Sequence, residues 1–281
     1  MLLTILFSLF AYLCDAKSTK PKESLKLMHW NIHGKTFKGA SVKRADLLTS
    51  MIQEHQPDVL FVNEPQQKNI QNYLGEIENG KRQGLKYNDK TYEYMGIVKE
   101  CGFLYRPGLL KQIEWDEWYP IVKNKLHEQN EKKNLSMLQD YKNARIRSRT
   151  MFAETSDFVL ISFHGRHKRG KDLKTNEKRM HTIKAKGISC LFRIAELIGR
   201  QRDKTVIIGG DFNFNVFDHL TDIQWPIGMK IAQRPKRLKK ATIDYFMYIG
   251  DVSIQSTKII ESPDVELFDH EILQLEIDPS W

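Results

Sequence analysis

The chain has 281 residues, of which 41% are hydrophobic and 28% charged, and its formal net charge is +9. This composition excludes a disordered or fibrous chain, because the apolar fraction can form a substantial core and the charged fraction is ordinary for a folded protein. The excess of Lys and Arg suits a polyanionic partner, although it also suits solubility.

The first sixteen residues differ from the rest of the chain. Residues 2–13 are almost wholly apolar, and the following Cys14 to Ala16 stand where a signal peptidase would cut. We therefore expect a signal peptide at 1–16 and a secreted protein that begins near Lys17; a buried N-terminal strand or helix is the alternative. No stretch approaches the roughly 20 apolar residues of a membrane-spanning helix, so we expect no stable membrane insertion.

Short apolar runs predict strands, and apolar residues at helical spacing predict helices between them. The expected helices are 42–54 and 183–198, and the expected strands are 25–30, 59–63, 101–105, 150–154, 158–164, 205–208, 242–249 and 271–277. Residues 123–143 and 218–240 read as irregular surface segments. Many strands interleaved with helices indicate packed sheets flanked by helices, and we expect 17–281 to form a single α/β domain.

Cysteines contribute little to this fold. Only Cys101 and Cys190 follow the predicted signal peptide, so no disulfide framework is possible. One bridge between them and two buried thiols remain equally open.

Polar residues mark the ends of these strands. The segment Gly209-Gly210-Asp211-Phe212-Asn213 follows a buried strand, and taken alone it could be a turn closed by the Asp side chain. Similar positions elsewhere are held by Asn31, Glu64, His164, Asp244, Asp269 and His270. So many polar strand ends are hard to attribute to turns. Carboxylate ligands favour Mg²⁺, whereas no Cys/His cluster has the spacing of a zinc site.

In order along the chain, these segments resemble the endonuclease/exonuclease/phosphatase superfamily, and most closely deoxyribonuclease I and the catalytic subunit of cytolethal distending toxin. The pieces that carry the resemblance are His29-Trp30-Asn31-Ile32, Val62-Asn63-Glu64, Arg149-Thr150-Met151-Phe152-Ala153-Glu154, Ser162-Phe163-His164, Gly210-Asp211-Phe212-Asn213, Ile243-Asp244-Tyr245-Phe246 and Asp269-His270. The resemblance implies a two-layer β-sandwich flanked by helices, which is the four-layer fold of deoxyribonuclease I.

The resemblance also implies roles for individual residues. Glu64 and Asp269, helped by Asn31, would hold Mg²⁺, for which Mn²⁺ or Ca²⁺ could substitute or assist. His270, paired with Asp244, would take a proton from the attacking water. Asp211 and Asn213 would position that water and a phosphate oxygen.

His164 is the residue that favours the deoxyribonuclease branch, because it could protonate the leaving oxygen or bind the phosphate. In the deoxyribonuclease pattern, a Glu supports this His from a strand that ends in an aromatic-Arg-Pro turn. Glu100, ahead of Tyr105-Arg106-Pro107, is the candidate for this Glu, although its spacing to that turn is one residue shorter than in the pattern. Arg149, Arg166 and Lys168 are the cations expected to contact the phosphate or the substrate.

We expect a secreted, metal-dependent phosphodiesterase that cleaves DNA, and a monomer. A phosphoinositide phosphatase or a sphingomyelinase-type enzyme, acting on a phosphorylated lipid or inositol, is the first alternative. A secreted binding protein that keeps the fold without catalysis is the second. The sequence does not distinguish DNA from RNA or single from double strands.

Overall fold

A computed structural model describes residues 24–32, 41–65, 70–78, 81–97, 100–129, 145–166, 177–233, 243–264 and 268–279. The predicted signal peptide at 1–16, the predicted substrate contact Lys168 and the basic cluster at 234–240 lie outside these residues.

The first of two six-stranded sheets, sheet 1, contains the earliest and latest strands of the chain. Its central strands β1 and β2 are parallel, with Asn31 beside Asn63 at their ends. The order across sheet 1 is β15 (Val252–Ile260), β16 (Ile272–Pro279), β1 (Leu25–Asn31), β2 (Val59–Asn63), β8 (Cys101–Tyr105) and β7 (Glu93–Ile97).

Sheet 2 is built from the middle of the chain. Its strands β11 and β12 are parallel, and β12 is antiparallel to β14. The order across sheet 2 is β13 (Met229–Gln233), β14 (Asp244–Ile249), β12 (Thr205–Asp211), β11 (Phe158–His164), β10 (Thr150–Glu154) and β9 (Lys111–Gln112). Two short pairs, β3 (Ile77–Glu78) with β4 (Lys81–Arg82) and β5 (Lys86–Tyr87) with β6 (Lys90–Thr91), lie apart from both sheets.

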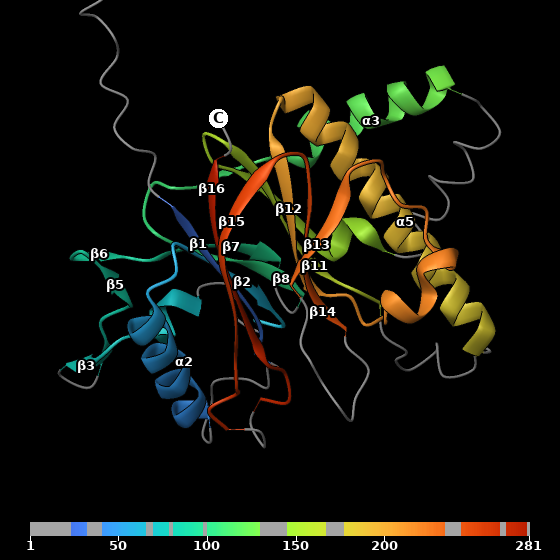
Figure 1. Ribbon diagram of the computed structural model, residues 1–281. Coiled ribbons are helices and arrows are strands. Elements are labelled where there is room, and N and C mark those ends of the chain that lie inside the picture. The colour runs from blue at the N-terminus through green and yellow to red at the C-terminus, as the bar shows by residue number, and fades with distance from the viewer. Residues whose placement is uncertain are drawn as a thin grey trace, which may run out of the picture.

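In the described part of the chain, helices cover the outer faces of the two sheets (Figure 1). Helix α2 (Ser41–His55) packs on sheet 1, whereas α5 (Glu177–Arg202) and α3 (Trp115–Gln129) pack on sheet 2. Short 3₁₀ turns are η1 (Ile70–Tyr73), η2 (Ile146–Ser148) and η4 (Phe217–Asp222). The arrangement confirms the predicted β-sandwich flanked by helices. Within the described ranges, no helix is both long enough and apolar enough to cross a membrane.

The two sheets meet over a core of large side chains. Leu27 and Phe61 of sheet 1 face Ile207 and Phe246 of sheet 2 in one buried cluster. Little space separates the sheets at Gly209, where an added Cβ would lie 2.7 Å from Phe61 Cδ1 of the facing sheet and 2.6 Å from Phe246 Cε1 of the neighbouring strand. A larger residue at this position would displace these rings, because packed cores have no room for an extra carbon.

Two predicted surface segments are more regular than expected. Helix α3 continues to Gln129, through the first part of the predicted irregular segment 123–143. The segment 218–240 contains β13 and most of η4. The apolar runs did not predict strand β15, because its side chains are largely polar and exposed, as is common at the edge of a sheet. Cys101 and Cys190 are buried thiols that are not joined in a disulfide, and burial raises the pKa of Cys101.

Candidate active site

Three polar side chains stand in a row at the end of sheet 2. His164 pairs with Asp211 across β11 and β12, and Asp211 pairs with Asp244 across β12 and β14. All three residues are at most 2% exposed. Because paired residues of neighbouring strands point to the same face, the row presents an imidazole and two carboxylates to the facing sheet.

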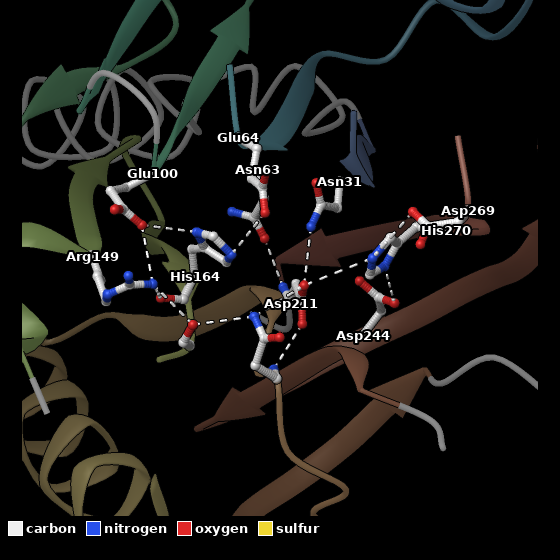
Figure 2. Close-up of polar contacts among 12 residues, drawn as sticks. Asn31, Asn63, Glu64, Glu100, Arg149, His164, Asp211, Asp244, Asp269 and His270 are labelled. Carbon is white, nitrogen blue, oxygen red and sulfur yellow. Dashed lines mark hydrogen bonds and ion pairs between the residues drawn. The ribbon is translucent and has the colours of Figure 1, made fainter. Parts of the chain in front are cut away.

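Three hydrogen bonds from sheet 1 reach this row, and the two made by Asn31 and Asn63 are drawn in Figure 2. Asn31 Nδ2 donates to Asp211 Oδ2 over 3.0 Å, and Asn63 Oδ1 accepts from the Asp211 backbone N–H over 2.7 Å. His29 Nε2 lies 3.0 Å from Asp244 Oδ1. His29 and Asn63 were given no role by sequence reasoning, although each lies within two residues of a predicted ligand. Buried polar groups need such partners, and here the partners fix the alignment of the two sheets.

His270 joins the row from the turn before β16. Its Nδ1 lies 2.8 Å from Asp244 Oδ2, so the structure places the predicted pair together. Its Nε2 is 3.9 Å from Asp211 Oδ2 and 3.7 Å from Asp269 Oδ1. The imidazole therefore has one nitrogen fixed by Asp244 and the other beside two further carboxylates.

The charges in this cluster determine where protons reside. Burial lowers the pKa of His270, but the attraction of Asp244, Asp211 and Asp269 outweighs burial and raises it to about 10. Burial also acts to raise the pKa of Asp244, yet His270 and His29 lower it below its usual range. Burial and the negative charge of Asp244 raise the pKa of Asp211. His270 is thus protonated at neutral pH when no cation is near, whereas Asp211 has an increased affinity for a proton.

The segment from Asp211 to Asn213 forms a turn and also directs polar atoms toward the other residues of the site. Asp211 Oδ1 accepts the Asn213 backbone N–H over 2.7 Å, which is the side-chain-closed turn considered from the sequence. Asp211 Oδ2 remains directed toward Asn31 and His270. Asn213 has φ +49°, and its Nδ2 donates to Gly165 O over 3.1 Å. Glu64 also has a positive φ, of +57°. A positive φ is common for Asn but rare for Glu, so Glu64 is the strained residue of the two.

The predicted partnership of His164 and Glu100 is present despite the short spacing. His164 Nδ1 lies 2.9 Å from Glu100 Oε2, and Nε2 lies 3.4 Å from Glu64 Oε1. The Glu100 carboxylate also lies 3.0 Å from Arg149 Nη1. His164 is therefore held by Glu100 at one nitrogen and faces Glu64 with the other.

For the phosphoester hydrolysis that the resemblance implies, we expect the Glu100→Gln substitution to lower kcat by up to about 100-fold with little change in KM, because a ring that loses its orientation loses reactive geometry. Steady-state kinetics on a soluble phosphodiester would measure this effect. The matched control is Glu78→Gln, an exposed change on β3. A variant that changes KM alone would show that Glu100 contributes to substrate binding and not to positioning.

Arg149 is buried beside the end of β11. The residue is 7% exposed, and its Nη1 donates to the carbonyl oxygens of His164, over 3.3 Å, and Gly165, over 3.0 Å, in addition to contacting Glu100. These contacts make Arg149 a support for Glu100 and for the end of β11. Its contact with a substrate phosphate stays a prediction. Arg166 is partly exposed directly beyond β11 and remains a candidate substrate contact.

The predicted metal ligands lie along the sheet 1 side of the site (Figure 2). Asn31 and Glu64 follow neighbouring strands, and Asp269 is the most open of the three, with 48% of its side chain exposed. An amide and two carboxylates at the rim are the oxygen donors that a hard divalent cation prefers. Asp211, Asp244 and His270 also have potential ligand atoms within 4.8 Å of one another. However, the short contact between His270 and Asp244 already uses one ligand atom of each residue.

No family profile and no curated protein matches this sequence. Its fold does match solved structures. D. rerio TDP2 carrying 14 humanizing mutations aligns with a TM-score of 0.58 at 16% identity, over 91% of this chain and 99% of that chain. D. rerio TDP2 complexed with a single-strand DNA product gives 0.51 at 14% identity, over 91% and 99%. An endonuclease/exonuclease/phosphatase from Bacteroides vulgatus gives 0.54 at 14% identity, over 92% and 100%.

Proposed function

The chain has the fold of the endonuclease/exonuclease/phosphatase superfamily, as its motifs predicted, and from this premise we propose that it is a divalent-metal-dependent phosphodiesterase that cleaves nucleic acid, with DNA as its substrate. The observation that carries the proposal is the buried contact between His270 and Asp244, with Asp211 beside the second imidazole nitrogen. A protein that kept the fold only for binding would have no need to bury two repelling carboxylates at one edge.

Hydrolysis of a phosphodiester needs a proton acceptor beside the attacking water. His270 Nε2 and Asp211 Oδ2, 3.9 Å apart, lie together at the edge of the site (Figure 2). A proton taken from water by either group is stabilised by the other and by Asp244 behind His270. The pair thus serves as one proton-accepting unit, which refines the predicted assignment of this role to His270 alone.

His164 lies on the opposite side of Asp211, at the end of the neighbouring strand. Glu100 holds its ring, so the imidazole can donate a hydrogen bond to a phosphate oxygen or a proton to the leaving oxygen. Asn213 is fixed by Asp211 and Gly165 at the same edge, where it can position the water or a phosphate oxygen. These groups border the reacting phosphate from the sheet 2 side.

Glu64, Asn31 and Asp269 would hold the cation, which we propose to be Mg²⁺. When bound, the cation would neutralise charge that develops on the phosphate oxygens in the transition state. Positive charge beside Asp269 would also lower the raised pKa of His270 and favour the neutral imidazole, which is the form that accepts a proton. The oxygen donors on the sheet 1 side of the site would thus bind the cation, whereas the imidazoles would transfer protons.

The choice of a nucleic acid rests on charge and on resemblance. The net charge of +9 favours a polyanion, because each neutralised phosphate releases counterions. The D. rerio TDP2 structure aligned above holds a single-strand DNA product. His164 matches the deoxyribonuclease I pattern at the position where the resemblance distinguishes branches of the superfamily.

The proposal is tested with purified protein and supercoiled plasmid, incubated with Mg²⁺ and separately with EDTA. We expect conversion to nicked circles in Mg²⁺ and intact plasmid in EDTA, read by gel electrophoresis. Intact plasmid in both would contradict the nuclease proposal. Phosphate release from phosphoinositides and phosphocholine release from sphingomyelin would then be measured, and turnover of neither would favour a binding protein.

We also propose that the protein acts outside the cell, on the strength of the signal-like segment at 1–16. The mass of the protein recovered from the medium of a secreting host should correspond to a chain that begins near Lys17. Retention of the intact chain inside the host would contradict this part of the proposal.

A further inference from the structure

A second group of side chains that could bind a metal shares no residue with the candidate active site, although the cavity beside it is also lined by Asn213. His181 is on the first half of α5, and His219 and Asp222 are on η4, which packs beside that helix (Figure 1). The potential ligand atoms of these three residues all lie within 4.8 Å of one another. Their side chains are between 33% and 47% exposed, so the cluster is open to ions from solution.

The distances in this cluster are too long for hydrogen bonds. Asp222 Oδ2 is 3.6 Å from His181 Nε2 and 3.4 Å from His219 Nδ1, beyond the usual range of 2.7–3.2 Å. His181 Nε2 is shielded from solvent and has no hydrogen-bond partner in the described part of the chain. Two nitrogens thus converge on one carboxylate oxygen without bonding to it.

The same distances suit a metal ion placed between the three atoms. In a tetrahedral zinc site with bonds of about 2.0–2.1 Å, neighbouring ligand atoms are about 3.4 Å apart. Two imidazole nitrogens and one carboxylate oxygen form a donor set that zinc accepts readily, whereas Mg²⁺ prefers oxygen alone. The cluster therefore differs chemically from the oxygen-rich rim formed by Asn31, Glu64 and Asp269.

Packing holds the two imidazole rings close to this arrangement. The centroids of His181 and His219 are 4.2 Å apart, with the rings inclined by 71°. Phe214 packs against both rings, at 5.0 Å from His181 and 5.1 Å from His219. A cavity of about 320 Å³ borders both histidines and gives room for a water molecule as a further ligand. Little rearrangement is needed before an ion can bind.

We propose that His181, His219 and Asp222 form a Zn²⁺ site separate from the candidate active site. Bound zinc joins η4 to α5, and these elements flank the segment that carries Asn213. Lys184 Nζ already fixes that segment by donating to Asn213 O over 2.7 Å. The role of the ion is structural, because its three protein ligands come from two elements that are far apart in the sequence and the ion holds these elements together. The inference does not depend on the proposed nuclease activity.

The test uses tag-free protein stripped of metal with EDTA and then dialysed. Zn²⁺ is titrated by calorimetry, and Co²⁺ is followed by the visible absorption of a tetrahedral site. We expect the original chain to bind Zn²⁺ at this site, and the His219→Ala and Asp222→Asn variants to bind it at least about tenfold more weakly. The Asp116→Asn variant is the matched control, because Asp116 is an exposed carboxylate on α3.

A His270→Ala variant separates the two sites, because it alters the candidate active site and leaves the cluster intact. We expect it to bind Zn²⁺ at the cluster as the original chain does. Loss of binding in His270→Ala, with full binding in His219→Ala and Asp222→Asn, would place the ion in the active site and overturn the proposal. Failure of the original chain to bind Zn²⁺ would also overturn it.

A thermal measurement detects binding independently of spectroscopy. At a free Zn²⁺ concentration about 100 times its Kd, the ion should raise the Tm of the original chain by about 5 °C. Asp222→Asn should fold without metal, since Asp222 is almost half exposed, and should show no such rise at the same concentration. An equal rise in both proteins would place the bound ion elsewhere.

Discussion

The His270→Ala variant should cleave plasmid DNA about 10²- to 10⁴-fold more slowly than the original chain, which is the range for loss of a general acid or base. The reason is the position of the ring, with Nδ1 fixed 2.8 Å from Asp244 and Nε2 beside Asp211. Removing the imidazole of His270 leaves Asp211 without the second group of the proposed proton-accepting pair. The initial rate of nicking in saturating Mg²⁺ measures the effect.

Two further variants show whether the effect is chemical. His270→Gln keeps an amide that can donate to Asp244, so it should preserve the fold while remaining nearly as slow as His270→Ala. His55→Ala removes another buried histidine, at the end of α2 and outside the site, and should cleave at the original rate. Undiminished turnover by His270→Ala would refute the assigned mechanism.

Asp211→Asn is the second change with a large expected effect, again about 10²- to 10⁴-fold in kcat. Asp211 accepts hydrogen bonds at both oxygens, from the Asn213 backbone at Oδ1 and from the Asn31 and Asn213 side chains at Oδ2. An Asn side chain has one acceptor and one donor, so its NH₂ group must meet a donor. The substitution therefore removes a proton acceptor and misplaces its neighbours.

The matched control for Asp211→Asn is Asp203→Asn. Asp203 is exposed after α5 with φ +52°, a conformation that Asn also adopts readily. Single-turnover rates of the two variants, together with their circular dichroism spectra, would separate chemistry from folding. Equal rates for the Asp211→Asn variant and the original chain would remove Asp211 from the mechanism.

Much of the fold could be predicted because the strands that form the site are short, buried apolar runs. The runs ending at His164 and Asp211 are fully buried strands, and their parallel pairing brings the polar residues after them to one edge. The pairing of His270 with Asp244 was expected from the resemblance and is present. Polar residues at strand ends were thus a reliable sign of the candidate site.

Other features could not be read from the sequence because they depend on contacts between distant elements. His29 lies inside a buried strand, where its burial alone does not distinguish a core residue from one that contacts Asp244. The contacts of Arg149 with Glu100 and with two carbonyl oxygens could not be predicted, because they join segments that are far apart in the sequence. His181 and His219 come from α5 and η4, so their spacing does not follow a zinc motif.

The division of the candidate site between two sheets would make the proposed activity sensitive to how those sheets are aligned. The proposed ligand Asn31 ends a strand of sheet 1 and Glu64 follows one, whereas Asp211 and Asp244 belong to sheet 2, and Gly209 lies where the two sheets pack closely. A small slide of one sheet would separate the proposed cation ligands from the proposed proton acceptor even if every strand stayed intact. The rate of hydrolysis would therefore be a finer measure of sheet alignment than secondary-structure content.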